Sequence, residues 1–130
     1  MLFNIIAYFM LNYKYMDIII YLPTLKSQNR FTNHRWAYNG YREEIRKEVM
    51  PQLLAAGKPI SDVLKVKYKF HKKGRLFDLT NYSTTIKIIE DCLVDAGIIK
   101  DDRDAFVKEV SISQVKSPDN FVEITLQRYS

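Results

Sequence analysis

The chain has 130 residues, of which 47% are hydrophobic and 27% charged, the proportions of an ordinary globular protein. This length excludes two independently stable halves, so we expect one domain with a single site. Twenty Lys and Arg against fifteen Asp and Glu give a formal net charge of +5, which favours an anionic partner such as nucleic acid. A single cysteine, Cys92, excludes an internal disulfide and argues against a zinc cluster. We expect its thiol to be buried and the protein to be located in the reducing cytoplasm.

The first sixteen residues are apolar but too short to span a bilayer. Asn4, Asn12 and Lys14 interrupt them, and they lack the basic start and the small-residue cleavage site of a secretory signal. We therefore predict no membrane partner. Residues 1–16 are interpreted as an N-terminal extension, and residues 17–130 as the functional domain.

The next segment predicts a strand and a basic loop. Residues 17–23, DIIIYLP, form a β-branched run closed by Pro23, which indicates a buried first strand. Residues 24–36 are polar and rich in Asn and Ser, so they predict a loop. This loop is either an ordinary solvated loop or a phosphate-binding one, because it gathers five candidate donors: Lys26, Asn29, Arg30, His34 and Arg35.

A helix and a lysine-bearing strand follow. Apolar residues spaced by three and four between residues 38 and 54 predict an amphipathic helix that Gly57 closes and Pro51 kinks or divides. Residues 62–73 alternate, with Lys65, Lys67 and Lys69 on one face of a half-buried strand. This lysine row either binds phosphates or protects a sheet edge against aggregation.

The remaining pattern completes a small α/β fold. Residues 82–96 predict a second helix that Gly97 ends. Residues 105–116 and 120–129 are β-rich and separated by an SPD turn, which predicts an antiparallel hairpin. The order β-α-β-α-β-β predicts a single α+β domain whose mixed sheet packs two helices on one face.

Acidic residues stand at both ends of the second helix. Asp78 precedes it, and Asp101 and Asp102 follow it. A helix of about fourteen residues rises about 20 Å, so these acids share a metal ion only if the chain folds back or a dimer brings the ends of two subunits together. Mg²⁺ needs only one or two protein carboxylates beside water and phosphate oxygens.

Three short motifs in this region resemble those of the RusA-type Holliday-junction resolvases, small phage and prophage endonucleases. The family pattern is D-x-D-N, a Lys, D-A-L and A-G-x-x-x-D-D. The matching segments here are DLTN at 78–81, KIIEDCL at 87–93 and AGIIKDD at 96–102. The family also opens with a strand ending in Pro and a polar S-x-N-R loop, similar to Pro23, Ser27, Asn29 and Arg30 here, so the resemblance covers about residues 17–128.

The resemblance implies a homodimer that binds four-way DNA junctions and cuts opposed strands with Mg²⁺, with Mn²⁺ as an alternative ion, in the cytoplasm of a bacterial host. Carried over to this chain, it implies metal binding by Asp78 and Asp102, with Asp101 and Thr80 beside them, and assistance from Lys87. The basic residues just before Asp78 are then expected to bind the DNA backbone without reading its sequence, although a solvated turn is the alternative: Lys72, Lys73 and Arg75.

Two departures from the family pattern affect this prediction. Thr80 stands where the family has its second Asp, and a hydroxyl is a weaker ligand for a hard cation than a carboxylate. About three extra residues separate Asn81 from Lys87, and Asn81 either caps the helix or orients a ligand. The sequence therefore leaves two alternatives to an active resolvase: a branched-DNA-binding relative that cleaves weakly, and an unrelated small α/β interaction protein.

Overall fold

The computed structural model describes residues 15–22, 24–31, 34–56, 65–99 and 109–127. Its elements follow the predicted order: β1 (Tyr15–Tyr21), the 3-10 helix η1 (Gln28–Phe31), α2 (Arg35–Ala55), β2 (Lys65–Lys72), the 3-10 helix η2 (Leu79–Tyr82), α3 (Ser83–Asp95), β3 (Glu109–Lys116) and β4 (Phe121–Gln127). The β-α-β-α-β-β prediction is confirmed. β1 begins at Tyr15, before residue 17, and Met16 lies in the core, while residues 1–14 of the predicted extension lie outside the described residues.

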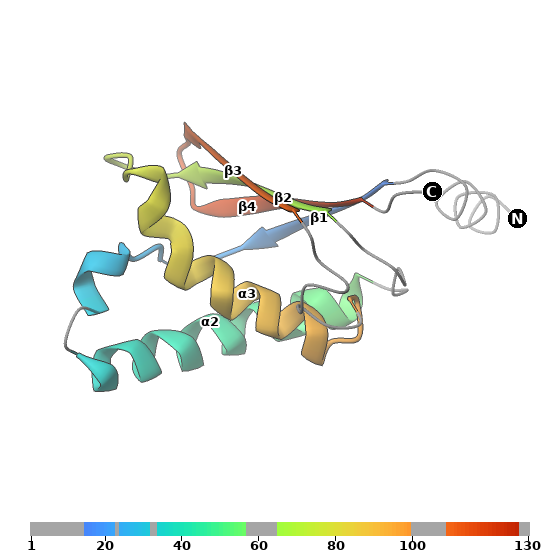
Figure 1. Ribbon diagram of the computed structural model, residues 1–130, viewed down its shortest axis with the longest axis horizontal. Helices are drawn as coiled ribbons and strands as arrows, with labels where there is room; N and C mark the ends of the chain where they lie inside the picture. Colours follow the sequence, from blue (N-terminus) through green and yellow to red (C-terminus); the bar gives the residue numbers. More distant parts are fainter. Residues whose placement is uncertain (1–14, 23, 32–33, 57–64, 100–108, 128–130) are drawn as a thin grey trace, which may run out of the picture.

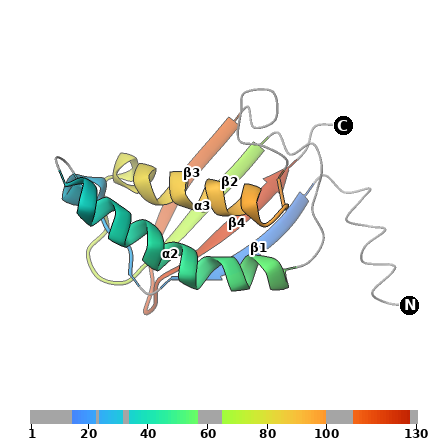
Figure 2. The ribbon, with the colours of Figure 1, turned by 90° about the horizontal axis from the view of Figure 1, so that it is seen from below.

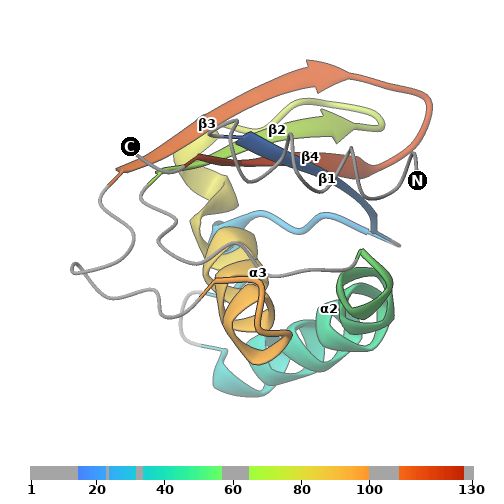
Figure 3. The ribbon, with the colours of Figure 1, turned by 90° about the vertical axis from the view of Figure 1, so that its right-hand side faces the viewer.

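Two helices cover one face of a four-stranded mixed sheet (Figures 1 and 3). The helix α2 buries residues four positions apart, Tyr41, Ile45, Val49 and Leu53, which form one stripe of its surface. Pro51 lies inside α2 without dividing it. The helices pack on each other as well as on the sheet, so the apolar core lies between the two layers.

The sheet order is β1-β4-β2-β3, and it overturns the predicted C-terminal hairpin. β4 pairs with β1 and β2, antiparallel to both, whereas β3 pairs in parallel with β2. The turn between β3 and β4 passes the end of β2 instead: the Ser117 N–H donates to the Lys72 carbonyl at 3.0 Å, and the Lys73 N–H donates to Asn120 Oδ1 at 2.8 Å. The turn thus stabilises the end of a third strand that lies between the two it connects.

The lysine-bearing strand β2 is an interior strand, so the edge-protection interpretation is wrong. Its alternation is confirmed, because Val66, Tyr68 and Phe70 are buried while Lys67 and Lys69 are exposed on the face opposite the helices. That face, uncovered by either helix (Figure 3), is called the open face below.

The first strand is a sheet edge and only half buried, contrary to the prediction of a buried strand. Ile19 and Tyr21 are 53% and 61% exposed on the open face. Gln52 of α2 covers part of the outer edge, because its Oε1 accepts from the Tyr21 N–H at 2.8 Å and its Nε2 donates to the Tyr21 carbonyl at 2.7 Å. This pair of bonds occupies backbone groups that a further strand would otherwise use.

Both helices begin at the end of the sheet where β1, β2 and β3 finish (Figure 2). Gly97 ends α3 with φ +75°, as predicted, and Ile98 and Ile99 return to the core. No helix in the described part of the chain combines the length and hydropathy needed to cross a bilayer.

Candidate nucleic-acid interface

The predicted basic loop and the predicted acidic turn lie at the same end of the molecule. η1, in the loop, is in contact with η2, which directly follows Asp78. The start of α2 and the end of β2 lie at this end too (Figures 1 and 2). Asn29 and Arg30 belong to η1, but their side chains lie outside the description. The fold therefore brings together two segments that are about fifty residues apart in sequence.

Asp78 occupies the position before η2, with extended backbone at φ −64° and ψ 140°. Its carbonyl accepts from the Asn81 N–H at 2.9 Å, while its exposed carboxylate makes no capping hydrogen bond. Thr80 is exposed as well, and its carbonyl accepts from Ser83 Oγ at 2.6 Å. The cap prediction for Asn81 is wrong, because α3 follows η2 without a break and has no side-chain cap.

A partly buried chain of two hydrogen bonds holds the turn that carries Asp78. Gln114 Nε2 on β3 donates to the Phe77 carbonyl at 2.5 Å, and the Tyr82 hydroxyl donates to Gln114 Oε1 at 2.6 Å. Burial raises the pKa of Tyr82 to about 12, so its hydroxyl keeps the proton it donates. Sequence reasoning missed Gln114; its one signal is a polar residue at a core-facing position, in register with Phe70.

Lys87 lies on the exposed side of α3, where its Nζ is 3.6 Å from Asp91 Oδ1 in an i,i+4 ion pair. Asp91 lies one helical turn beyond Lys87, on the side away from Asp78, so the ion pair directs the Lys87 side chain away from Asp78. Asp101 and Asp102 lie outside the described residues. Their described flanks, Ile99 and Glu109, lie at the far end of α3 and at the start of β3.

The acid site is incomplete within the described ranges. No three His, Cys, Asp or Glu side chains gather there in a way that could hold a metal ion. Asp78 and the Thr80 hydroxyl are exposed oxygen donors of the kind that Mg²⁺ accepts. The described residues thus supply one carboxylate of the implied metal site, and Asp101 or Asp102 would have to supply the rest.

The basic residues differ in how much of their charge is compensated. Lys26 Nζ is 3.8 Å from Glu44 Oε2 and 5.4 Å from the centre of the Tyr41 ring. Lys72 Nζ donates to the Lys73 carbonyl at 2.6 Å and lies 4.8 Å from the centre of the Phe77 ring. Among the described side chains, the exposed cations at this end of the molecule are Arg35, Lys73, Arg75 and Lys116.

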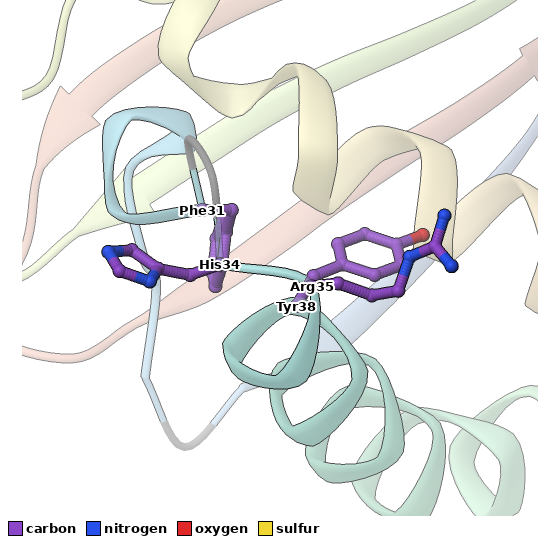
Figure 4. Close-up of a pocket in the computed structure, with 4 residues that line it drawn as sticks. All are labelled: Phe31, His34, Arg35 and Tyr38. Carbon is purple, nitrogen blue, oxygen red and sulfur yellow. The ribbon is translucent and has the colours of Figure 1, made fainter.

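The start of α2 is hollowed. Phe31, His34, Arg35 and Tyr38 line a shallow cavity of about 470 Å³ (Figure 4). Arg35 and Tyr38 extend to one side of the helix start and His34 to the other (Figure 4). Two of the predicted phosphate donors therefore line the same cavity.

A scan against protein-family models finds no match to this chain, and a search of curated proteins finds none either. The resemblance described above therefore rests on the quoted motifs alone.

Proposed function

We propose that the protein is a metal-dependent endonuclease that binds and cuts branched DNA, such as a four-way junction. One observation carries the proposal: η1 meets η2, so the basic loop, the basic turn and Asp78 converge at one end of the sheet. Cations there would neutralise backbone phosphates without reading sequence. An acid within that basic surface would then lie close to a bound phosphodiester.

Asp78 would hold Mg²⁺ together with Asp101 or Asp102, with Mn²⁺ as an alternative ion. The metal would supply an activated water and offset charge on the phosphate. The contribution of the described chain is positional, since Gln114 and Tyr82 fix the backbone on both sides of Asp78. The exposed Thr80 hydroxyl would contact metal-bound water or a phosphate oxygen.

The open face supports a homodimer. At one end of it, Tyr21, Phe121, His71 and Val115 form a row across the four strands. The Tyr21 and Phe121 ring centres are 5.6 Å apart, and the Phe121 and His71 rings stack at 4.0 Å. Tyr21 and Val115, at the two ends of this row, are exposed apolar side chains, and such groups on a face that no helix covers are typical of an interface.

The charges on the open face are self-complementary. Lys69 on β2 lies in register with Glu123 on β4. A two-fold axis along the strands between β4 and β2 would place Lys69 opposite Glu123 of the partner subunit, and Tyr21 opposite the partner's Val115. Such an isologous dimer would offer two sites for the two strands of a junction.

Thr80 and the single described carboxylate favour a second candidate function, a branched-DNA-binding protein that cuts weakly. The two functions differ in one assay. Purified protein is incubated with a labelled four-way junction or with linear duplex of matching sequence, in Mg²⁺, Mn²⁺ or EDTA. Paired metal-dependent nicks in the junction alone support the endonuclease, whereas junction binding without nicks supports the second candidate.

Variants at Asp78 and Thr80 sharpen the assay. Asp78→Asn should abolish cutting and leave junction binding equal or tighter, because it removes a negative charge beside the phosphates. Asp119→Asn is the matched control, since Asp119 is an exposed acid in the turn at the same end of the molecule. Thr80→Asp should raise the cutting rate sharply if Thr80 lies at the metal.

Two results would count against the proposal. One is an Asp78→Asn protein that cuts normally. The other is DNA affinity that ignores branching and collapses with salt, which is expected of a small interaction protein with a basic surface.

A further inference from the structure

Trp36, the only tryptophan of the chain, is 77% exposed in the first turn of α2. Its ring centre lies 6.1 Å from that of His34, in an edge contact. Exposed apolar side chains are common singly, so the surroundings decide whether this one has a role.

The surroundings of Trp36 are concave. A second shallow cavity of about 480 Å³ lies beside it, lined by Lys26, Phe31, Trp36, Ala37, Gly40, Tyr41 and Glu44. Phe31 also lines the first cavity, which Figure 4 shows, so the two hollows adjoin around the start of α2. The exposed indole therefore lines one of two shallow hollows that share Phe31, at the end of the molecule that also carries Asp78.

Gly40 leaves the helix surface bare one turn after Trp36. Glycine destabilises a helix interior relative to alanine. A Cβ built on Gly40 would meet no atom within 4 Å, so no crowding inside the protein requires glycine there. Side chains in a helix lean toward its N-terminus, so a longer residue at position 40 would cover the surface beside Trp36. Because Gly40 has no side chain, the protein surface beside the Trp36 ring stays uncovered.

Cations border this surface. The first turn of α2 contains no acidic residue, and Arg35 directly precedes Trp36 on the helix. Two acids follow one turn after Gly40: the exposed Glu43, and Glu44, which is partly compensated because its Oε2 lies 3.8 Å from Lys26 Nζ. A flat aromatic group beside cations matches one chemistry, a nucleobase with its phosphate, because bases stack on aromatic rings and phosphates pair with Arg and Lys.

We infer that the surface formed by Trp36 and Gly40 receives an unstacked base of a DNA strand, whose flanking phosphate pairs with Arg35. The inference rests on the proposed function, because a branch point presents the unpaired bases that a continuous duplex lacks. The binding step itself needs neither metal nor cutting, so it is measured separately from the activity.

Trp36 reports on its own contact, since no other residue contributes tryptophan fluorescence. In EDTA, a single-stranded oligonucleotide and a four-way junction should each quench the emission strongly at saturation. A duplex of the same sequence, closed at both ends by synthetic linkers, should leave it nearly unchanged even where it binds through its phosphates. Equal quenching by all three DNAs, or none by any, overturns the inference.

Variants test the same contact by the anisotropy of a labelled single-stranded oligonucleotide. Trp36→Ala should weaken binding by about 5- to 150-fold, the range expected for one lost base stack, whereas Trp36→Phe should retain most of the affinity. Leu54→Ala is the matched control, because Leu54 is 65% exposed on the same helix, far from the cavities. A Trp36→Ala protein that binds within twofold of the parent refutes the contact.

Gly40→Gln separates binding from folding. It should raise Tm by about 2–4 °C, because glycine is a poor helix former, and still weaken binding by about tenfold, because the new side chain covers the surface. A more stable variant with unchanged affinity would overturn the inference.

The outcomes also separate this inference from the proposed endonuclease. Selective quenching without nicks in any metal sustains the base contact and rejects the endonuclease. Junction cutting without any change in Trp36 emission supports the endonuclease and rejects the base contact.

Discussion

Gln114 is the residue whose removal should most clearly test how the turn at Asp78 is held. Gln114→Ala deletes two hydrogen bonds, to the Phe77 carbonyl at 2.5 Å and from the Tyr82 hydroxyl at 2.6 Å. Each bond contributes about 1 kcal/mol, and a buried hydroxyl left without a partner costs about 1–3 kcal/mol. Tyr82 is fully buried, so we expect a total loss of about 2–4 kcal/mol in the free energy of unfolding.

The loss is measured by urea unfolding and by thermal denaturation. An unfolding entropy of about 2.1 cal/mol/K per residue makes the expected fall in Tm about 7–15 °C for this chain. Tyr82→Phe should cost only about 0.5–1.5 kcal/mol, because Gln114 keeps its bond to Phe77 and is itself only partly buried.

The double variant supplies the refuting result. In a Gln114→Ala background, Tyr82→Phe removes a hydroxyl that has already lost its acceptor, so the double variant should be at least as stable as Gln114→Ala alone. Two results would refute the reasoning. One is a double variant whose loss of unfolding free energy equals the sum of the two single losses. The other is a Gln114→Ala protein whose unfolding free energy lies within about 0.5 kcal/mol of the parent's, which is the spread of surface substitutions. In the endonuclease assay, Gln114→Ala should reduce cutting even at temperatures where the protein remains folded, because Asp78 is no longer held in place.

Three further outcomes are expected. Burial raises the pKa of Tyr82 from 10.0 to about 12, so the folded state keeps a proton that the unfolded state releases; the stabilisation is complete below pH 10 and lost toward pH 12, by an amount on the order of 2 kcal/mol. Urea unfolding gives the free energy of unfolding at pH 9 and at pH 11. The fall in that free energy between the two pH values should be smaller for Tyr82→Phe than for the parent, and equal falls would contradict this. Burial likewise raises the pKa of Cys92 to about 11, so a thiol reagent at pH 7.5 should label the native protein only as fast as it unfolds; labelling at the rate of a free thiol would show that Cys92 is accessible. Finally, Tyr21→Lys should shift the proposed dimer to monomer in sedimentation velocity, whereas Leu54→Lys, an equally exposed position on α2, should not; an unchanged assembly would exclude the open face as the interface.

The strand pairing shows where sequence reasoning stopped. Adjacent β segments with a turn between them predict a hairpin, yet β4 lies between β1 and β2. The reason lies in burial: Val122, Ile124 and Leu126 of β4 are fully buried and need neighbours on both sides. β3 carries Ser111 and Ser113 and is largely exposed, which suits an edge. Comparing the apolar content of the two segments would have favoured β4 as the central strand.

The sequence by itself determined the order of elements, the single domain, the two faces of β2 and the stop of α3 at Gly97, because hydrophobic periodicity and glycine conformation act locally. It also singled out Asp78 and the basic segments through motifs. Only the tertiary structure decided that the basic loop meets the acidic turn, that Gln114 on β3 holds that turn, and that Trp36 borders an open surface. Those relations join residues far apart in the chain, and local pattern carries no information about which distant segment completes a buried hydrogen bond or a shared core.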